Sequence, residues 1–319
     1  MPNNIETFHA LDELIARGNA RLDEFDTITF DVFDTLLIRR VPDPDMVKIP
    51  TARLISDLAA QRGISKSPHE VRKLREVIEN RHRQENGAKH PDFEANYDEF
   101  MPEILHEIFG ETYTPSLFEQ VAAFEVKMES AMIVARVELA DWIKQLSKMG
   151  KRLLLISDIY LPAKYIKKLV ENVGLLEYFE EVISSADSFQ AKASGAAWPL
   201  IEQRFKLDKT RWLHIGDNPI SDGARPVEAG IHAMVLKDIG EHHRLSLATR
   251  YNYYAAHRDF WKGRNLLQWA LPLEAENQDR DALYSDGHGF LGYLLCYFIH
   301  RLIERCKDEN IQRIYFCAR

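Results

Sequence analysis

Acidic side chains stand where apolar stretches of this sequence end. Residues 28–37 read Ile-Thr-Phe-Asp-Val-Phe-Asp-Thr-Leu-Leu, so Asp31 and Asp34 follow a run typical of a buried strand. A carboxylate buried at a strand end needs a metal ion, hydrogen bonds or a role in chemistry to offset its lost hydration. The alternative is that these aspartates merely cap a turn or a helix, and this stretch alone leaves both interpretations open.

Three later stretches repeat the pattern. The residues that follow their apolar runs are Ser157 and Asp158, then Lys192, then Asp217 and Asp222. Taken singly, each has an ordinary structural explanation: a helix cap, a surface lysine or a turn residue. Purely structural roles for the whole set would require four independent coincidences in a fixed chain order.

A phosphoryl ligand gives each of these groups a chemical use. The carboxylate of Asp31 can attack phosphorus to give an acyl-phosphate, and carboxylates such as Asp31 and Asp217, with a backbone carbonyl, can hold Mg²⁺. The hydroxyl of Ser157 and the ammonium of Lys192 can bind the equatorial oxygens of the transferring group. Lys192 is also expected to keep Asp31 ionised.

Alternating strand and helix patterns must position these residues. An amphipathic helix is expected within residues 5–22, leading into a strand that ends near Phe30. Beyond residue 147, the predicted strands are 151–158, 181–185, 211–217 and 230–236, and the predicted helices are 162–173 and 197–205. This alternation predicts an α/β protein with a doubly wound parallel sheet, in which ligands bind beyond the carboxyl ends of the strands.

The stretch from about residue 46 to residue 147 shows helical periodicity and high charge, and no convincing strand pattern. We therefore expect a helical insertion after the first strand, preceded by a proline-rich break at residues 41–46. Its basic side chains are interpreted as a solvated helix face, in preference to a surface that grips the substrate: Arg72, Lys73, Arg75, Arg81 and Arg83.

Together these motifs resemble those of the haloacid dehalogenase-like (HAD) hydrolase superfamily. The similarity is carried by Phe-Asp-Val-Phe-Asp-Thr-Leu at 30–36, the strand ending in Ser157, Lys192, and Gly-Asp-Asn-Pro-Ile-Ser-Asp at 216–222. It covers about residues 25–240. The amino-acid sequences of these motifs are similar to those of a bacterial subgroup of predicted hydrolases associated with surface-polysaccharide glycosyltransferases.

The resemblance implies a domain organisation and a set of roles. It implies a HAD-like Rossmannoid core at 1–42 and 148–240, a helical cap at 43–147 and a mostly helical C-terminal segment at 241–319. It implies a Mg²⁺-dependent phosphohydrolase acting on a small phosphorylated metabolite or sugar phosphate. The implied roles are catalysis by Asp31, Ser157 and Lys192, phosphate binding by Ser157, Lys192 and Thr35, and metal binding by Asp31, the Phe33 backbone carbonyl, Asp217 and Asp222.

One position departs from the family pattern. The family's phosphatases carry an Asp two residues after the nucleophile, as the acid that protonates the leaving group, whereas this chain has Phe33. The role is not transferred to Asp34, since successive strand-end residues need not face the same way. Loss of a general acid costs about 10²- to 10⁴-fold in rate.

Three hypotheses therefore stay open. The chain is a phosphohydrolase that uses a good leaving group or another acid, such as one from the cap. Alternatively, it is a non-catalytic module that binds phosphate or a nucleotide sugar and serves a glycosyltransferase. The third hypothesis is a dehalogenase-type hydrolase, which needs no such acid; the metal-site pattern at 216–222 makes it the least favoured.

Composition restricts the class of protein. The 319 residues suffice for two domains, 45% are hydrophobic, and the mean hydropathy is −0.33. A net charge of −8 provides no general field for binding nucleic acid, and the widely spaced Cys296, Cys306 and Cys317 fit a reducing cytoplasm. No signal peptide is evident, and the longest apolar run, near residues 290–299, is too short to span a bilayer. We expect a cytoplasmic protein without nucleic-acid partners.

The last 79 residues or so follow the HAD-like region and have their own pattern. Aromatic and basic residues alternate between 250 and 269 and are interpreted mainly as a packing surface. A mostly apolar helix is expected at 287–303 and a strand at 310–317. Because one helix and one strand cannot form an α/β domain, this segment either docks on the core or begins a further α/β domain. The resemblance to the subgroup, whose members commonly continue past such a strand, implies the start of a further, truncated α/β domain, with a glycosyltransferase as a fused domain or a partner.

Overall fold

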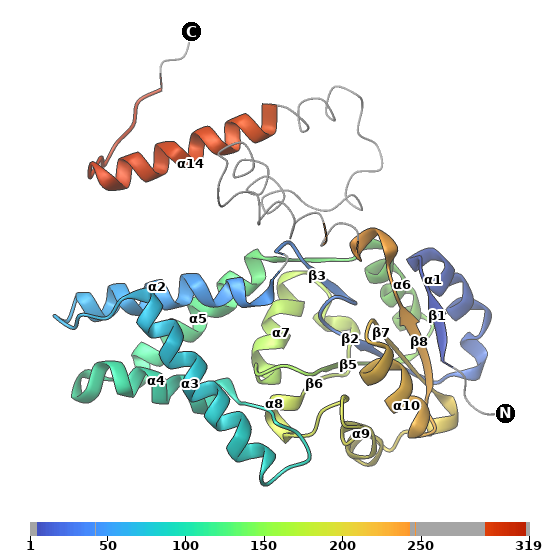
Figure 1. Ribbon diagram of the computed structural model, residues 1–319. Helices are drawn as coiled ribbons and strands as arrows, with labels where there is room; N and C mark the ends of the chain where they lie inside the picture. The colour runs from blue at the N-terminus through green and yellow to red at the C-terminus, as the bar shows by residue number, and fades with distance from the viewer. Residues whose placement is uncertain (1–4, 42, 243–245, 247–290, 317–319) are drawn as a thin grey trace. The chain divides into compact units, whose positions relative to one another are not determined.

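The central sheet of the computed structural model has six parallel strands (Figure 1). In spatial order they are β1 (Glu6–Phe8), β8 (His232–Leu236), β7 (Trp212–Gly216), β2 (Thr27–Asp31), β5 (Arg152–Ser157) and β6 (Glu181–Ser184). Each neighbouring pair runs parallel. The predicted doubly wound parallel sheet is therefore confirmed, and the carboxyl ends of its central strands lie along one edge.

The structure describes residues 5–41, 43–242, 246 and 291–316. The described chain falls into two units. The first comprises residues up to 39 together with 43–239, and contains the whole sheet. The second contains helix α14 (Tyr293–Asp308) and is described separately below.

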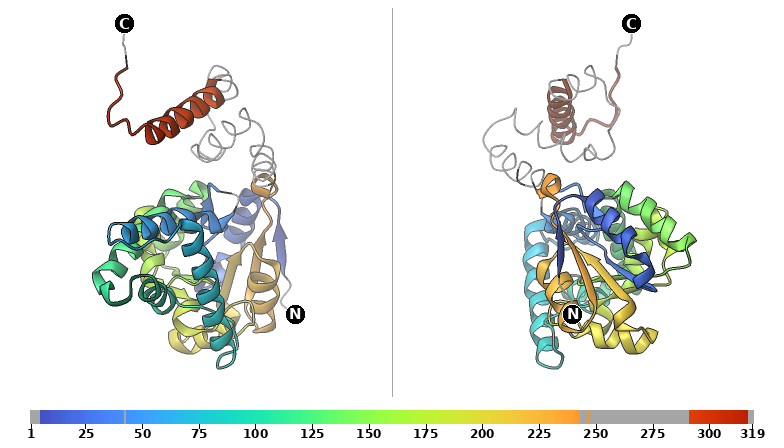
Figure 2. Two further views of the ribbon diagram at one scale, coloured as in Figure 1. Left: turned by 60° about the vertical axis from the view of Figure 1, so that its left-hand side comes forward. Right: turned by 90° about the vertical axis from the view of Figure 1, so that its right-hand side faces the viewer.

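Alternate residues of the strands are buried in two different hydrophobic clusters. In β5, Leu153 and Leu155 belong to the larger cluster, whereas Leu154 and Ile156 belong to the smaller one. Successive side chains of a strand point to opposite faces, so both faces of the sheet are covered. Figure 2 shows helices on both sides of the strands.

The larger cluster takes in apolar side chains from α1 (Leu11–Ala20), α6 (Val137–Lys148) and α7 (Ala163–Asn172). The smaller one is covered by α9 (Ala197–Phe205), through Trp198 and Ile201. Two one-turn helices complete this part of the chain, α8 (Ser185–Ser188) and α10 (Arg225–Glu228). The helices predicted at 162–173 and 197–205 are confirmed.

Four helices lie between Arg39 and Ile133, within the stretch expected to be a helical insertion. They are α2 (Lys48–Ala60), α3 (Pro68–Gly87), α4 (Tyr97–Phe109) and α5 (Pro115–Ala131). Their starts are encoded locally: Ser67 and Glu70 form a capping box for α3, and the Thr114 side chain caps α5. Proline at the first helical position of α3 and of α5 is pre-organised for the helix.

A two-stranded antiparallel ladder joins the two ends of this insertion. It pairs β3 (Leu37–Arg39) with β4 (Ile133–Ala135), and places Arg39 opposite Ile133. Strand β4, which follows α5, is absent from the sequence-based expectation, because residues 46–147 show no convincing strand pattern. The helix in fact stops at Ala131, and three residues are too few for a recognisable strand pattern.

Two further expectations were wrong in detail. Residues 6–8 form the edge strand β1 rather than part of a helix, because they pair with β8 at the other end of the unit. Described residues 311–316 form no strand, although the sequence predicts one there. The helix expected at 287–303 occurs as α14, and the aromatic stretch at 250–269 lies outside the described residues.

Helix α14 carries exposed apolar side chains, among them Leu294, Phe298 and Ile299. None of the helices in the described ranges has the length and apolar character needed to cross a bilayer.

Candidate active site

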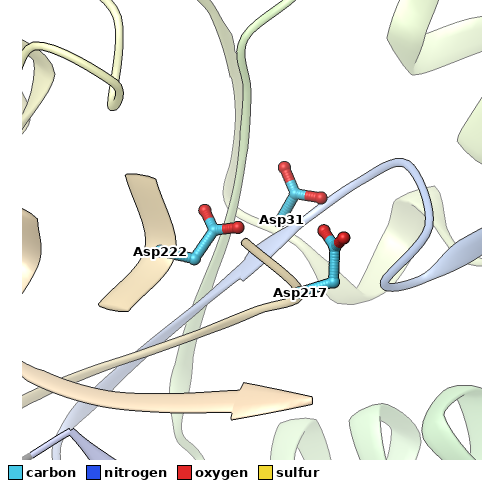
Figure 3. Close-up of side chains that lie close together, drawn as sticks. All are labelled: Asp31, Asp217 and Asp222. Atoms are coloured by element: carbon cyan, nitrogen blue, oxygen red, sulfur yellow. The ribbon is translucent and has the colours of Figure 1, made fainter. Parts of the chain in front are cut away.

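Three carboxylates from separate parts of the sequence converge at the carboxyl edge of the sheet. Asp31 ends β2, Asp217 directly follows β7, and Asp222 lies in a short π-helical segment, Pro219–Ala224. One oxygen from each lies within 4.8 Å of the others (Figure 3). Parallel register produces this convergence, because β2 pairs with β7 and the two strands end together.

Lys192 lies among these carboxylates. Its ammonium donates hydrogen bonds to Asp31 Oδ1 at 2.5 Å and to Asp222 Oδ1 at 2.6 Å, and the residue is 1% exposed. Lys192 comes from the loop between α8 and α9, which Asp158 anchors: the two carboxylate oxygens of Asp158 accept the backbone N–H groups of Lys192 and Ala193, at 2.9 and 3.0 Å. Asp158 therefore positions the lysine.

Asp222 is held on both sides. Its Oδ1 is also 3.1 Å from Nε2 of the buried His214, and its Oδ2 accepts the backbone N–H of Asn218 at 2.9 Å. Gly216 makes this approach possible, since a Cβ at that position would lie 2.3 Å from Asp222 Cγ. Burial opposes ionisation of Asp222, but the Lys192 ammonium and the His214 contact keep its pKa below the ordinary value.

The site holds more negative than positive charge. Burial raises the pKa of Asp31 well above its ordinary value; Lys192 opposes the rise, and the neighbouring Asp222 and Asp217 add to it. Burial, with Asp222 and Asp34, likewise raises the pKa of Asp217. Lys192 acts in the direction expected from the sequence, since it lowers the pKa of Asp31 against the effect of burial.

The donor set fits a hard divalent cation. Carboxylate oxygens are the ligands that Mg²⁺ prefers, and a charge of +2 would balance three carboxylates that face one ammonium. Asp31 and Asp217 are the better candidates for direct ligation, since both oxygens of Asp222 already accept hydrogen bonds.

A cavity of about 530 Å³ opens onto this cluster. Its lining contains most of the residues predicted from the sequence: Asp31, Phe33, Ser157, Lys192, Asp217 and Asp222. Thr35 is not in the lining; it is fully buried and its hydroxyl donates to Asp217 Oδ1 at 3.4 Å.

Phe33 and Asp34 lie in the turn that follows β2. Asp34 has φ of 62°, a left-handed conformation that Asp adopts more readily than most residues, and its carboxylate pairs with Arg39 at 3.1 Å. The Arg39 guanidinium lies 4.2 Å from the centre of the Phe33 ring. Both Phe33 and Asp34 line the cavity, so the departure from the family pattern lies within the site itself.

The helical insertion contributes the opposite wall of the cavity. Lys48 comes from α2, Glu79 and Arg83 from α3, and Glu129 from α5. These residues were not predicted as site residues. One signal was present: Glu125 and Glu129 continue, at helical spacing, the buried stripe that begins with Leu117 and Val121.

Arg75 is also placed differently from the expectation of a solvated face. It is 4% exposed and forms a bidentate ion pair with Glu125, at 2.9 and 2.8 Å, while the hydroxyls of Tyr97 and Tyr160 donate to the same carboxylate. This buried network fixes α3 against α5, and so fixes the wall from which Glu79, Arg83 and Glu129 reach the cavity.

Comparison with known proteins identifies the family. Residues 25–224, more than half of the chain, match the family described as haloacid dehalogenase-like hydrolase. The chain belongs to the haloacid dehalogenase-like hydrolases. The match spans every strand that carries a residue of the carboxylate cluster, from β2 to the turn after β7.

Solved structures with similar folds include both phosphatases and dehalogenases. A 2-haloacid dehalogenase from Pseudomonas syringae is 16% identical, with a TM-score of 0.46, over 70% of this chain and 98% of that one. A HAD phosphatase from Thermococcus onnurineus is 15% identical, with a TM-score of 0.41, over 69% and 97%. A predicted phosphoglycolate phosphatase from Haemophilus somnus is 15% identical, with a TM-score of 0.40, over 67% and 85%. None of the curated proteins matched the sequence.

Proposed function

We propose that this HAD-like hydrolase is a Mg²⁺-dependent phosphohydrolase that acts through an aspartyl-phosphate on a small phosphorylated substrate. The observation that carries the proposal is the contact of the Lys192 ammonium with Asp31, beside Asp217 and Asp222. A buried carboxylate next to both an ammonium and a hard-cation donor set is suited to attack on a phosphoryl group, whose oxygens need positive charge around them.

In this proposal Asp31 is the nucleophile. Lys192 and the Ser157 hydroxyl bind the phosphoryl oxygens, and both side chains line the cavity. Thr35 has the weakest support as a phosphate ligand, because its buried hydroxyl already bonds to Asp217.

The proposed cation ligands are Asp31, Asp217 and the backbone carbonyl of Phe33, with Asp222 in support. When bound there, Mg²⁺ would neutralise the excess of carboxylate charge and draw electron density from the transferring group. Asp222 would keep Lys192 charged and directed at the substrate through their 2.6 Å contact.

The finer expectations from the sequence are kept as part of this proposal. Residues 43–147 act as a cap that determines which substrate enters, a role supported by the insertion residues in the cavity wall. A cytoplasmic location, a function in polysaccharide synthesis and a glycosyltransferase partner are supported by the sequence resemblance.

Phe33 favours a second candidate, a module that binds phosphate without turnover, since the usual leaving-group acid is missing at this position. Binding would then use Ser157 and Lys192 as above, and Asp31 would act only as a ligand.

A phosphatase panel separates the two candidates. We expect turnover of at least one phosphate monoester to require Mg²⁺ and to fall at least about 10³-fold in Asp31→Asn, since removal of a nucleophile leaves only binding and electrostatic effects. Phosphate binding with no turnover that depends on both Asp31 and Mg²⁺ would establish the second candidate instead. Halide release from 2-haloacids that persists in EDTA would point to dehalogenation.

A further inference from the structure

The wall of the cavity contains six carboxylates besides Asp31, Asp217 and Asp222, and five of them are neutralised or held by donors. Their partners within 3.1 Å are Arg39 for Asp34, Lys48 for Asp45, Arg83 for Glu79 and for Glu94, and two backbone N–H groups for Asp158. Each of these five groups therefore has an ion-pair or hydrogen-bond partner in the folded protein.

Glu129 is the exception. Its side chain lines the cavity, the residue is 3% exposed, and within the described part of the chain its Oε2 atom is buried without a hydrogen-bond partner. Burial without a partner costs the ionised carboxylate much more free energy than the protonated acid, and the protonated acid carries a proton that it can donate.

The β3–β4 ladder brings Glu129 to the side of the site where Phe33 lies. Glu129 is in the last turn of α5, four residues before Ile133, which pairs with Arg39. Arg39 in turn lies over the Phe33 ring at 4.2 Å, and among the charged groups it has the largest effect on the pKa of Glu129. The insertion thus delivers an acid into the cavity that Phe33 also lines, and Phe33 is the position where the family's phosphatases carry theirs.

We propose that Glu129 is the general acid and base of this hydrolase, supplied by α5 in place of the aspartate that Phe33 replaces. This proposal rests on the proposed phosphohydrolase function.

The proton balance is complete with this single group. As the Asp31 carboxylate oxygen bonds to phosphorus and the bond from phosphorus to the ester oxygen breaks, the Glu129 carboxyl gives its proton to that oxygen, and the alcohol leaves. Glu129, now a carboxylate, takes a proton from the water that attacks the aspartyl-phosphate. Phosphate is released, and both Asp31 and protonated Glu129 are restored.

The protonation state of Glu129 suits this cycle. Burial raises the pKa of Glu129 to about 7; Arg39 from β3, Arg75 from α3 and Lys48 from α2 oppose the rise, and Glu125 from α5 itself adds to it. A pKa near the working pH lets one group both donate and accept a proton. Because the acid must be protonated for the first step, kcat/KM for an unactivated ester is expected to fall as the pH rises through about 7.

Leaving-group dependence tests the proposal. The first probe is p-nitrophenyl phosphate, whose p-nitrophenolate is a good leaving group and needs no proton. The second is glycerol 2-phosphate, whose alkoxide must be protonated as it leaves. We expect Glu129→Gln to lower kcat/KM for glycerol 2-phosphate by about 10²-fold or more and to change that for p-nitrophenyl phosphate only a few-fold. The fall above pH 7 should disappear in the variant. Glu119→Gln, at an exposed position of the same helix, is the matched control and should change neither probe.

The outcomes distinguish a failure of the proposed phosphohydrolase function from a failure of the proposed role of Glu129. If the wild type shows no Asp31-dependent turnover of p-nitrophenyl phosphate, the proposed function and this inference both fail. The inference alone fails if that turnover occurs but glycerol 2-phosphate is not hydrolysed, or if Glu129→Gln slows both probes equally with an unchanged pH profile, as a purely structural role would do. It also fails if Asp34→Asn, rather than Glu129→Gln, produces the leaving-group effect.

Discussion

Replacing Glu129 by Gln should stabilise the folded protein increasingly as the pH rises. Burial raises the pKa of Glu129 from 4.5 to about 7, so the unfolded chain loses this proton at a lower pH than the folded protein. Between these two pKa values the unfolded state binds fewer protons, and the free energy of unfolding of the wild type falls with increasing pH. A glutamine at this position does not titrate and removes that slope.

The size of the effect follows from the shift. Proton linkage with pKa values of 4.5 and about 7 gives a destabilisation by Glu129 of about 0.8 kcal/mol at pH 5 and about 3.3 kcal/mol at pH 8. The stability of Glu129→Gln relative to the wild type should therefore increase by about 2.5 kcal/mol between these pH values. Any constant packing cost of the glutamine cancels in this comparison.

Urea unfolding followed by tryptophan fluorescence measures the difference, since Trp142, Trp198 and Trp212 are buried in the unit that contains the sheet. Experiments in EDTA at pH 5 and pH 8 remove any contribution from metal binding. Glu119→Gln serves as the control and should follow the wild type at both values. A stability difference between Glu129→Gln and the wild type that stays constant from pH 5 to pH 8 would refute the assignment of a buried, protonated Glu129.

Two further expectations concern the buried ion pair and the metal. Arg75→Met should lower the free energy of unfolding by about 3–5 kcal/mol in urea titrations, because it leaves the fully buried Glu125 carboxylate without its bidentate partner. The double variant Arg75→Met with Glu125→Leu should recover most of this loss. A cost below about 1 kcal/mol in the single variant would contradict the role of the pair. Mg²⁺ at ten times its dissociation constant should stabilise the wild type by about 1.4 kcal/mol. Asp217→Asn should lose most of that gain, and an equal gain in this variant would remove Asp217 from the ligand set.

The sheet and the residues at its carboxyl edge could be predicted from the sequence because both are encoded locally. An apolar run that ends in Asp31, Ser157 or Asp217 marks a strand and its functional end in the same few residues. Parallel topology then brings these ends together without further information.

The opposite wall was not predictable in the same way. Glu129 is one of several glutamates in a charged helix, and apart from its helical spacing with Leu117 and Val121, only tertiary packing distinguishes it from the exposed Glu119. Arg75 appeared to belong to a basic surface, because its partner Glu125 is fifty residues away in the chain. Strand β1 was missed for a similar reason, since three residues acquire strand structure only by pairing with β8.

The β3–β4 ladder separates the sheet, which carries Asp31, from the helices of the insertion. Because Arg39 and Ile133 are held opposite each other, the segment between them begins and ends at one place, and its closure free energy changes only slowly with its length. Helices α2 to α5 can therefore be lengthened, shortened or exchanged while the sheet keeps its register and Asp31 its place. Such an exchange would replace the cavity wall that the insertion supplies and, with Glu129, the proposed proton donor as well. In this protein, exchange of the insertion would therefore change the substrate and the general acid at the same time.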